Sequence, residues 1–392
     1  CFFMLTEHFH NTQKDTGHYS NDLRYVLSLQ NTIAAFEEIK TWEGYAKTPL
    51  HSLDSLASDI GVKNIYYKDE SSRFGLGSFK ALGGTYGVLK FIHHALKKEI
   101  GDEVSMKDIH AGKYSEQISK YTVTTATDGN HGRSVAFGAK LFGCKCQIYI
   151  HSEVSSGRQK AMEDLEATVN RVSGNYDESL QICIEDAGKN NWHVISDTSY
   201  EGYTKYPRYI MAGYNVMAEE IIDQIKDRPL PTHVFLQGGV GSFPGAICGY
   251  FWEKFPGNNI KFVVVESEHA PCLIRSAQNN QMTSVSIKQE TMMAGLSCGE
   301  PSLLGWEILK SGTDDFITIN DSSIPGLMRL LAKNNLKIEA GESSVAGLAG
   351  LIESMEDQKI AEAMELNKES IVLLFGTEGA TDPDIYRSII SE

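Results

Sequence analysis

Short apolar segments alternate with helical patterns over most of this chain, and this alternation limits the folds that it can adopt. From about residue 50, segments rich in β-branched and aromatic side chains recur between turn-forming or charged residues. The strand-like segments are 64–68, 121–125, 146–150, 193–196, 232–236, 261–265 and 371–375, and helical stretches include 83–99, 132–142, 178–189 and 209–225. Such an order predicts βαβ units, and hence an α/β fold of mainly parallel sheets with helices on both faces.

The length of the chain favours two domains, because 392 residues exceed what one hydrophobic core usually serves. Residues 92–213 carry three or four of the predicted strands and are bounded by a polar insertion at 97–120 and by the segment 203–207. We therefore expect a smaller domain at 92–213 that is inserted into a larger domain. The larger domain would be formed by 1–91 and 214–392.

The charge balance excludes several classes of partner. Acidic residues outnumber basic ones by 51 to 36, which gives a formal net charge of −15 and argues against nucleic acid or an anionic membrane. No segment approaches the roughly 20 apolar residues of a membrane span. The apolar start at 1–5 is too short for a signal peptide and lacks a basic flank. We expect a cytoplasmic protein that binds a small molecule.

The seven cysteines are scattered and none has the spacing of a zinc site, so no metal is expected. Most should be buried thiols. Cys272 and Cys298 bracket a polar stretch at 278–281 and could approach each other across a loop. A reducing compartment disfavours a disulfide between them.

A glycine-rich turn follows the segment 232–236 and precedes a helical stretch at 246–252. Glycines allow backbone N–H groups to converge on an anion, and the following helix N-terminus adds a favourable dipole. Because the turn matches neither a nucleotide-binding P-loop nor a dinucleotide fingerprint, it predicts a site for a monophosphate. A tight packing turn is the alternative. The residues of this turn are Gly238, Gly239, Val240, Gly241 and Ser242.

A second turn, 127–132, follows the segment 121–125 and opens a helix of small residues. The amide of Asn130 can hydrogen-bond a phenolic oxygen, and the N–H groups of the turn can bind a carboxylate. The carboxylate of Asp128 is unfavourable in a turn that receives anions. It therefore indicates either a catalytic group or the commoner role of Asp before Gly, an N-cap or Asx-turn residue. From the residues alone, His131 is expected to be structural.

Lys80 and Thr377 complete the pattern. Lys80 follows a Gly/Ser-rich loop at 74–78 and runs into a predicted helix, and Thr377 follows the last strand-like segment. A lysine amine whose pKa is lowered by desolvation or by a neighbouring cation can form a Schiff base. The alternatives are a surface lysine and a strand-ending turn. The turns favour the reactive lysine, because ligands of parallel sheets bind beyond the carboxyl ends of strands.

Together these elements resemble the fold-type II pyridoxal-phosphate (PLP) enzymes, the group of the threonine and serine dehydratases. The motifs occur in the order typical of this group and in the same positions relative to the predicted strands, from about residue 45 to 383. Within this group the chain looks most like the diaminopropionate ammonia-lyases, since typical dehydratases have a small residue at the position of Asp128. The motifs that carry the similarity are 127–132, 197–203, 293–301, 341–344 and 376–382.

The resemblance implies that the larger domain binds PLP. Lys80 would hold the cofactor as a Schiff base, the turn 238–242 would bind its phosphate, and Phe79 would pack against its ring. Asn130 would contact the ring 3′-oxygen, and Thr377 would meet the pyridine nitrogen. A neutral hydroxyl does not hold that nitrogen protonated as a carboxylate would, which favours β-elimination over transamination.

The resemblance also implies a reaction, in which ammonia is eliminated from D- or L-2,3-diaminopropionate and the product hydrolyses to pyruvate and a second ammonia. Lys80 would take the α-proton of the L isomer, and Asp128, on the opposite ring face, that of the D isomer. Asp197 would attract the second ammonium of the substrate, with a loop-capping role as its alternative. A homodimer is expected. The implied substrate contacts are Thr127, Gly129, His131, Asp197 and Ser343.

Three other functions stay open. A serine/threonine dehydratase of the same fold would eliminate a hydroxyl and merely tolerate Asp128. A PLP-binding protein without turnover is disfavoured, because it has no need of Lys80, Asn130 and Thr377 together. An unrelated α/β binding protein would carry no PLP and would therefore be colourless when purified.

Overall fold

The computed structural model describes residues 6–15, 17–127, 129–174, 176–333 and 337–391. The chain divides into two compact units. The large unit takes the described parts of Cys1–Phe79, Thr198–Glu201 and Tyr214–Glu392, and the small unit those of Lys80–Asp197 and Gly202–Gly213. The division expected from the sequence differs at residues 80–91, which here begin one continuous helix. The inserted smaller domain at 92–213 stays a prediction.

A seven-stranded sheet lies at the centre of the large unit. Its order is β1-β10-β9-β8-β11-β3-β2, with the five inner strands parallel and the two edge strands antiparallel. β8, β10 and β11 are buried along their whole length, as expected for strands of a covered parallel sheet. The strands are β1 (Glu7–His10), β2 (Leu50–Ser52), β3 (Asn64–Asp69), β8 (His233–Gln237), β9 (Lys261–Ser267), β10 (Asp315–Ile319) and β11 (Ile371–Gly376).

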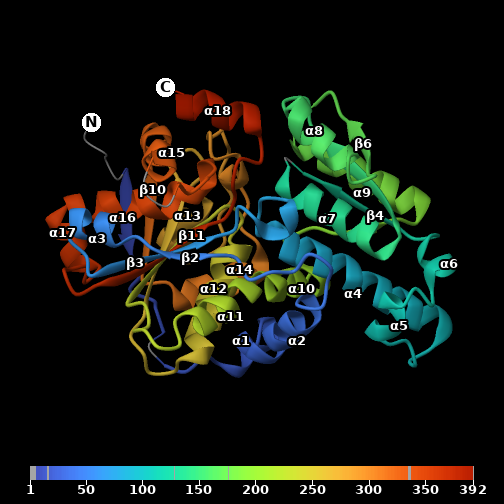
Figure 1. Cartoon of the computed structure of the whole chain (residues 1–392), viewed down its shortest axis with the longest axis horizontal. Helices are drawn as coiled ribbons and strands as arrows, with labels where there is room; N and C mark the ends of the chain where they lie inside the picture. The colour runs from blue at the N-terminus through green and yellow to red at the C-terminus, as the bar shows by residue number, and fades with distance from the viewer. Residues whose placement is uncertain (1–5, 16, 128, 175, 334–336, 392) are drawn as a thin grey trace. The chain divides into compact units, whose positions relative to one another are not determined.

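Helices cover both faces of this sheet (Figure 1). Val263, Ile317 and Leu374 belong to a core cluster with α15 and α16. Phe375 points to the other face and packs against Phe243 of α12, with ring centroids 5.3 Å apart. The predicted α/β fold class is thus confirmed. The helices are α1 (Asn21–Val26), α2 (Leu29–Ile39), α3 (Asp54–Ile60), α11 (Val216–Gln224), α12 (Ser242–Lys254), α13 (Cys272–Asn279), α14 (Leu303–Gly312), α15 (Ile324–Lys333), α16 (Ala346–Glu356), α17 (Gln358–Ala363) and α18 (Pro383–Ser391), with 3₁₀ turns η1 (Arg73–Gly75), η2 (Ala294–Leu296), η3 (Asp321–Ser323) and η4 (Glu342–Val345).

The small unit holds a four-stranded parallel sheet of order β6-β5-β4-β7. Helices α4 and α7 approach closely at Gly84, which has no side chain. A Cβ atom at this position would lie only 1.8 Å from Ser134 Oγ of α7. This contact lies near the starts of both helices, at Lys80 and Asn130. The elements are β4 (Thr122–Ala126), β5 (Lys145–Ile150), β6 (Thr168–Arg171), β7 (His193–Val194), α4 (Lys80–Ile100), α5 (Met106–His110), α6 (Ser115–Ile118), α7 (Asn130–Phe142), α8 (Ser156–Glu163), α9 (Tyr176–Asn190) and α10 (Lys205–Tyr214).

The helix expected at 209–225 is in fact two helices, α10 and α11, which separate at Asn215. The break has a structural reason, since α10 lies mainly in the small unit and α11 in the large one. Asn215 is anchored within the large unit, where its side-chain amide donates to Thr32 Oγ1 at 3.0 Å.

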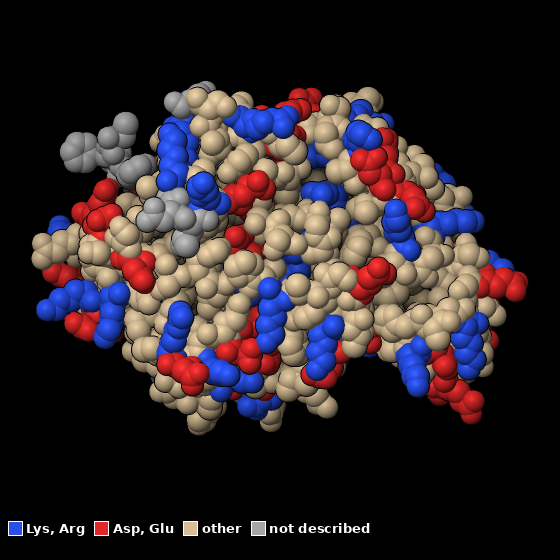
Figure 2. Space-filling view, in the orientation of Figure 1, with Lys and Arg blue, Asp and Glu red and all other residues tan. Residues whose placement is uncertain are grey.

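Acidic and basic side chains are interspersed over the face seen in Figure 2. Some exposed ion pairs have helical spacing, for example Lys160 with Asp164 at 2.8 Å. None of the described helices is long and apolar enough to cross a membrane. Cys272 and Cys298 are thiols that are not joined by a disulfide.

Candidate functional site

The loop that leads into Lys80 is held against the segment that follows β11. Glu70 N–H donates to Gly376 O at 2.8 Å, Phe79 N–H donates to Thr377 O at 3.0 Å, and Gly379 N–H donates to the carbonyl of Gly77 at 2.9 Å. These backbone bonds fix both ends of the loop within the large unit.

A buried cluster of charged residues lies at the start of the same loop. The Arg73 guanidinium donates to Glu70 Oε2 and to Glu220 Oε2, both at 2.8 Å, and the Lys68 ammonium donates to Glu220 Oε2 at 2.7 Å. All four side chains are at most 1% exposed. Burial acts to raise the pKa of Glu220, but the two cations outweigh it and lower the pKa to about 2. No motif or spacing in the sequence indicates this cluster.

The glycine turn connects β8 to the N-terminus of α12, as expected. Gly241 has φ = +96° and no side chain caps the helix that begins at Ser242. A Cβ atom at Gly238 would lie 2.7 Å from Leu273 Cδ1, and one at Gly239 would lie 3.0 Å from a backbone carbonyl oxygen. Ser302 N–H donates to Val240 O at 2.6 Å. Side chains are thus excluded at the glycine positions of this turn, where backbone atoms are exposed to a ligand instead.

Thr377 lies directly after β11 and is 3% exposed. Its hydroxyl accepts a hydrogen bond from Gln237 Nε2 at 3.1 Å. Two polar atoms nearby, Gln237 Oε1 and Ser343 Oγ, are buried without a hydrogen-bond partner among the described residues. Buried polar atoms are normally satisfied, so these atoms indicate a polar ligand at this place. Sequence reasoning missed Gln237, although a polar residue that ends an apolar strand before a glycine turn is a usable signal.

In the small unit, Lys80 and Asp197 form an ion pair between Nζ and Oδ2. Their side chains are 20% and 15% exposed. Burial acts to raise the pKa of Asp197, but the Lys80 ammonium outweighs it and holds that pKa well below its usual range. The structure therefore brings together two of the residues singled out from the sequence, in a contact that was not itself foreseen.

His131 lies beside this ion pair, with Nδ1 3.8 Å from Asp197 Oδ2. Its Nε2 lies 2.8 Å from the carbonyl oxygen of Ile195, which can only accept a hydrogen bond. Burial is the main cause of a lowered pKa for His131. The ring is thus neutral at physiological pH, with its hydrogen on Nε2 and a lone pair on Nδ1.

The turn at the start of α7 is shaped by Thr127. Its hydroxyl oxygen accepts from Gly129 N–H and from Gly132 N–H, both at 3.1 Å. A Cβ atom at Gly132 would lie 2.3 Å from the Thr127 methyl group, so only glycine fits there. Asn130 is the first residue of the helix. Asp128 lies outside the described residues.

The candidate residues divide between the units. The large unit carries Phe79, the turn 238–242, Ser343 and Thr377. The described candidates of the small unit are Lys80, Thr127, Gly129, Asn130, His131 and Asp197. Phe79 is 6% exposed and packs against the rings of Tyr214 and Phe243, with centroids 4.8 and 4.9 Å away.

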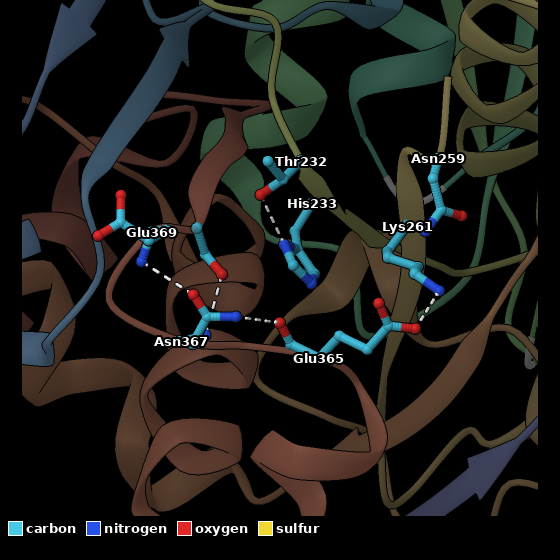
Figure 3. A pocket seen from close by; sticks show the side chains of 8 residues that line it. Thr232, His233, Asn259, Lys261, Glu365, Asn367 and Glu369 are labelled. Atoms are coloured by element: carbon cyan, nitrogen blue, oxygen red, sulfur yellow. Dashed lines mark hydrogen bonds and ion pairs between the residues drawn. The ribbon is translucent and has the colours of Figure 1, made fainter. Parts of the chain in front are cut away.

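A separate polar pocket of about 220 Å³ lies at the amino ends of β8, β9 and β11, and therefore away from the glycine turn (Figure 3). Its side chains largely satisfy one another. Lys261 Nζ lies 2.6 Å from Glu365 Oε1, and Thr232 Oγ1 lies 2.8 Å from His233 Nδ1. We assign it no part in the site.

Three comparisons with known proteins bear on this geometry. A family model described as "Pyridoxal-phosphate dependent enzyme" matches residues 41–376. The diaminopropionate ammonia-lyase of Escherichia coli (strain K12) is 38% identical over 357 residues, which cover 89% of this chain and 88% of the relative. A probable D-serine dehydratase from Sinorhizobium medicae (strain WSM419) is 23% identical over 333 residues, 80% of this chain and 74% of that relative.

A crystal structure gives the same result at the level of the fold. The diaminopropionate ammonia lyase from Escherichia coli, in complex with an aminoacrylate-PLP azomethine reaction intermediate, matches 100% of this chain and 98% of its own. The TM-score is 0.88 and the sequence identity 35%. The resemblance inferred from the motifs is therefore confirmed.

Proposed function

This chain belongs to the family of pyridoxal-phosphate dependent enzymes, and on that premise we propose that it eliminates ammonia from 2,3-diaminopropionate to yield pyruvate and two ammonia. One observation carries the proposal: the chain is 38% identical to a diaminopropionate ammonia-lyase over 89% of its length. Its identity to a probable D-serine dehydratase is 23%. The cofactor is pyridoxal phosphate.

The residues of the large unit fit this cofactor. The turn 238–242 would hold the phosphate, because its glycines exclude side chains and the N-terminal dipole of α12 favours an anion. The unsatisfied Ser343 Oγ requires a polar partner, which a cofactor or substrate oxygen would supply. Thr377 would contact the ring nitrogen, and Phe79 would pack against the ring. When bound, PLP supplies an electron sink that stabilises negative charge at the α-carbon of the substrate.

Lys80 and Asp197 would handle the proton and the amines. Lys80 Nζ would hold the cofactor and, once released, take the α-proton of the L isomer. In the structure the Asp197 carboxylate pairs with the Lys80 ammonium. The same carboxylate would attract the second ammonium of the substrate when the lysine amine is neutral. Charge complementarity of this kind would select a diamine over a hydroxy-amino acid.

The turn before α7 would bind the remaining groups of the substrate. Gly129 and Gly132 donate to Thr127, and the other N–H groups at the start of α7 would suit a carboxylate close to Gly129. Thr127 would act by shaping the turn, because its hydroxyl oxygen accepts from two N–H groups of the same turn. The lone pair of His131 Nδ1 would accept a hydrogen bond from a substrate amine. Asn130 would contact the ring 3′-oxygen.

Asp128 would be the second base, which takes the α-proton of the D isomer from the opposite face of the ring. Support for this role comes from its position in the turn 127–132 and from the resemblance stated above. We further propose that the enzyme is a cytoplasmic homodimer, which is the assembly that the resemblance implies and the location expected from the sequence. Light scattering on the purified holoenzyme tests the dimer, which should have twice the mass of one chain.

The proposed function is tested by the substrate range of the purified, PLP-loaded protein. D- and L-2,3-diaminopropionate, L-serine and L-threonine are compared by kcat/KM for release of the keto acid, with Lys80→Ala as the inactive control. We expect both diaminopropionate isomers to be preferred. Turnover of the hydroxy-amino acids alone would make the enzyme a dehydratase, and absence of all turnover would contradict the assignment as a lyase.

A further inference from the structure

Gln237 joins three segments of the large unit. It is the last residue of β8 and is 1% exposed. Its amide nitrogen Nε2 lies 2.7 Å from Phe375 O, 3.1 Å from Ser343 O and 3.1 Å from Thr377 Oγ1. These partners lie at the end of β11, in η4 and just after β11.

The neighbours of this amide determine its orientation. Phe375 O and Ser343 O are carbonyl oxygens, which only accept hydrogen bonds. If the amide were reversed, Gln237 Oε1 would face both carbonyls without a hydrogen between them. The NH₂ group therefore faces these three acceptors with its two hydrogens, one of which is shared between two of them. Because an amide nitrogen does not accept, the hydroxyl oxygen of Thr377 accepts from Gln237 and does not donate to it.

The hydroxyl of Thr377 is polarised in one direction by this contact. A hydroxyl has one hydrogen, and an oxygen that already accepts from Gln237 keeps that hydrogen for a different acceptor. The two nearby carbonyls are already bound by the Gln237 amide. The hydrogen is thus directed to a ligand atom that accepts, and a pyridine nitrogen without a proton is such an atom.

We propose that Gln237 is a positioning residue that makes Thr377 a hydrogen-bond donor to the ring nitrogen of PLP and so keeps this nitrogen unprotonated. The proposal rests on the proposed function, because it takes the contact between Thr377 and the ring nitrogen from there. An unprotonated ring withdraws electrons less strongly. Gln237, which never touches the substrate, would thereby favour elimination over transamination.

The test measures the protonation of the ring nitrogen directly. The holoenzyme is loaded with PLP that carries ¹⁵N in the ring, and the ¹⁵N resonance is followed against pH before any substrate is added. In the unsubstituted protein we expect the signal of an unprotonated, hydrogen-bonded nitrogen throughout the neutral range. In Gln237→Met, Phe375 O and Ser343 O lose their donor and compete for the Thr377 hydrogen. We then expect the signal to shift toward that of a protonated ring.

A second variant covers the case in which Gln237→Met does not fold. Gln237→Glu keeps the shape of the side chain. A carboxyl group has at most one hydrogen to donate to the three acceptors, whereas the amide NH₂ group has two. This variant should shift the resonance in the same direction. Thr377→Val provides the control, because Gln237→Met should cause no further shift in that background if it acts through Thr377.

The outcomes separate this inference from the function on which it rests. A resonance that is unchanged by both Gln237 variants would overturn the role of Gln237, even if diaminopropionate is turned over. An equal shift in the Thr377→Val background would overturn it as well, because the effect would then bypass the hydroxyl. Failure of the unsubstituted protein to bind PLP would instead refute the proposed function.

Discussion

Replacement of Arg73 by methionine should destabilise the protein strongly, although Arg73 touches neither cofactor nor substrate in the proposed site. The five N–H groups of its guanidinium make six hydrogen-bond contacts, one of them shared, with Glu70, Glu220, Thr48 Oγ1 and the carbonyl of Ala46. With Lys68 it balances the charges of two buried carboxylates. Arg73→Met fills most of the same volume but leaves one negative charge without compensation.

The magnitude follows from the burial of the cluster. Removal of one partner from a buried ion pair costs about 3–5 kcal/mol, because the remaining charge stays out of water. An exposed pair would contribute less than about 1 kcal/mol. Since the charged side chains are at most 1% exposed, we expect the larger loss. The double variant Arg73→Met/Glu70→Gln restores neutrality and should recover about half of it.

The pH dependence of the loss has a definite sign. In the unsubstituted protein the pKa of Glu220 is lowered to about 2 from its usual 4.5, so its stabilising contribution is present above the usual value and disappears as the pH falls toward 2. Without Arg73, burial raises this pKa and is opposed by Lys68 alone. Protonation then relieves the buried charge. The loss caused by Arg73→Met should therefore be smaller at about pH 5 than at about pH 8.

Urea unfolding followed by circular dichroism, at both pH values, measures these free energies. PLP binding is measured in parallel, because residue 73 lies in the loop that leads into Lys80. A loss below about 1 kcal/mol at pH 8 would refute the argument. So would a double variant that is no more stable than the single one.

Three further predictions concern single residues. Gly241→Ala should weaken PLP binding in a fluorescence titration, because φ is +96° there and a side chain at that φ costs about 1–2 kcal/mol. The matched control is Gly257→Ala, where φ is +83° and no atom lies near the added Cβ. This control should leave PLP affinity unchanged. Burial raises the pKa of Glu353 from 4.5 to about 7, so its folded-state contribution is favourable below the usual value and is lost as the pH rises through 7. Glu353→Gln should thus raise the unfolding free energy by about 1–3 kcal/mol at about pH 8 and change little at about pH 4, and equal stability at the higher pH would contradict this. Asp128→Asn should reduce kcat/KM for the D isomer much more than for the L isomer, and an equal loss would rule out the two-base scheme.

The parts of the fold that depend on local sequence could be predicted. The inner strands β3, β8, β9 and β11 contain apolar runs, so the α/β class and a glycine turn at 238–242 could be predicted from the residues. The inner strand β10 was not predicted, because Asp315 and Thr318 interrupt its apolar residues. The start of α4 at Lys80 follows in the same way from the preceding Gly/Ser-rich loop. The edge strands β1 and β2 gave no such signal, because they are only four and three residues long and are half exposed.

Contacts between distant residues could not be predicted from one sequence. The partners in the Lys80–Asp197 pair are 117 residues apart, those in Arg73–Glu220 are 147 apart, and those in Gln237–Thr377 are 140 apart. No spacing rule connects such pairs, since their approach is set by strand order and by the packing of α11 and η4. A polar residue in an apolar run marks the place of such a contact but does not identify its partner.

The central claim, that this chain is an ammonia-lyase for a diamine, is tested most directly by the stoichiometry of its products. The holoenzyme is incubated with L-2,3-diaminopropionate, and ammonia and pyruvate are measured in the same sample, with Lys80→Ala as the control. Elimination of the β-amino group followed by hydrolysis releases two ammonia for each pyruvate. A ratio of two confirms the account. A ratio of one, or no pyruvate above the Lys80→Ala control, contradicts it.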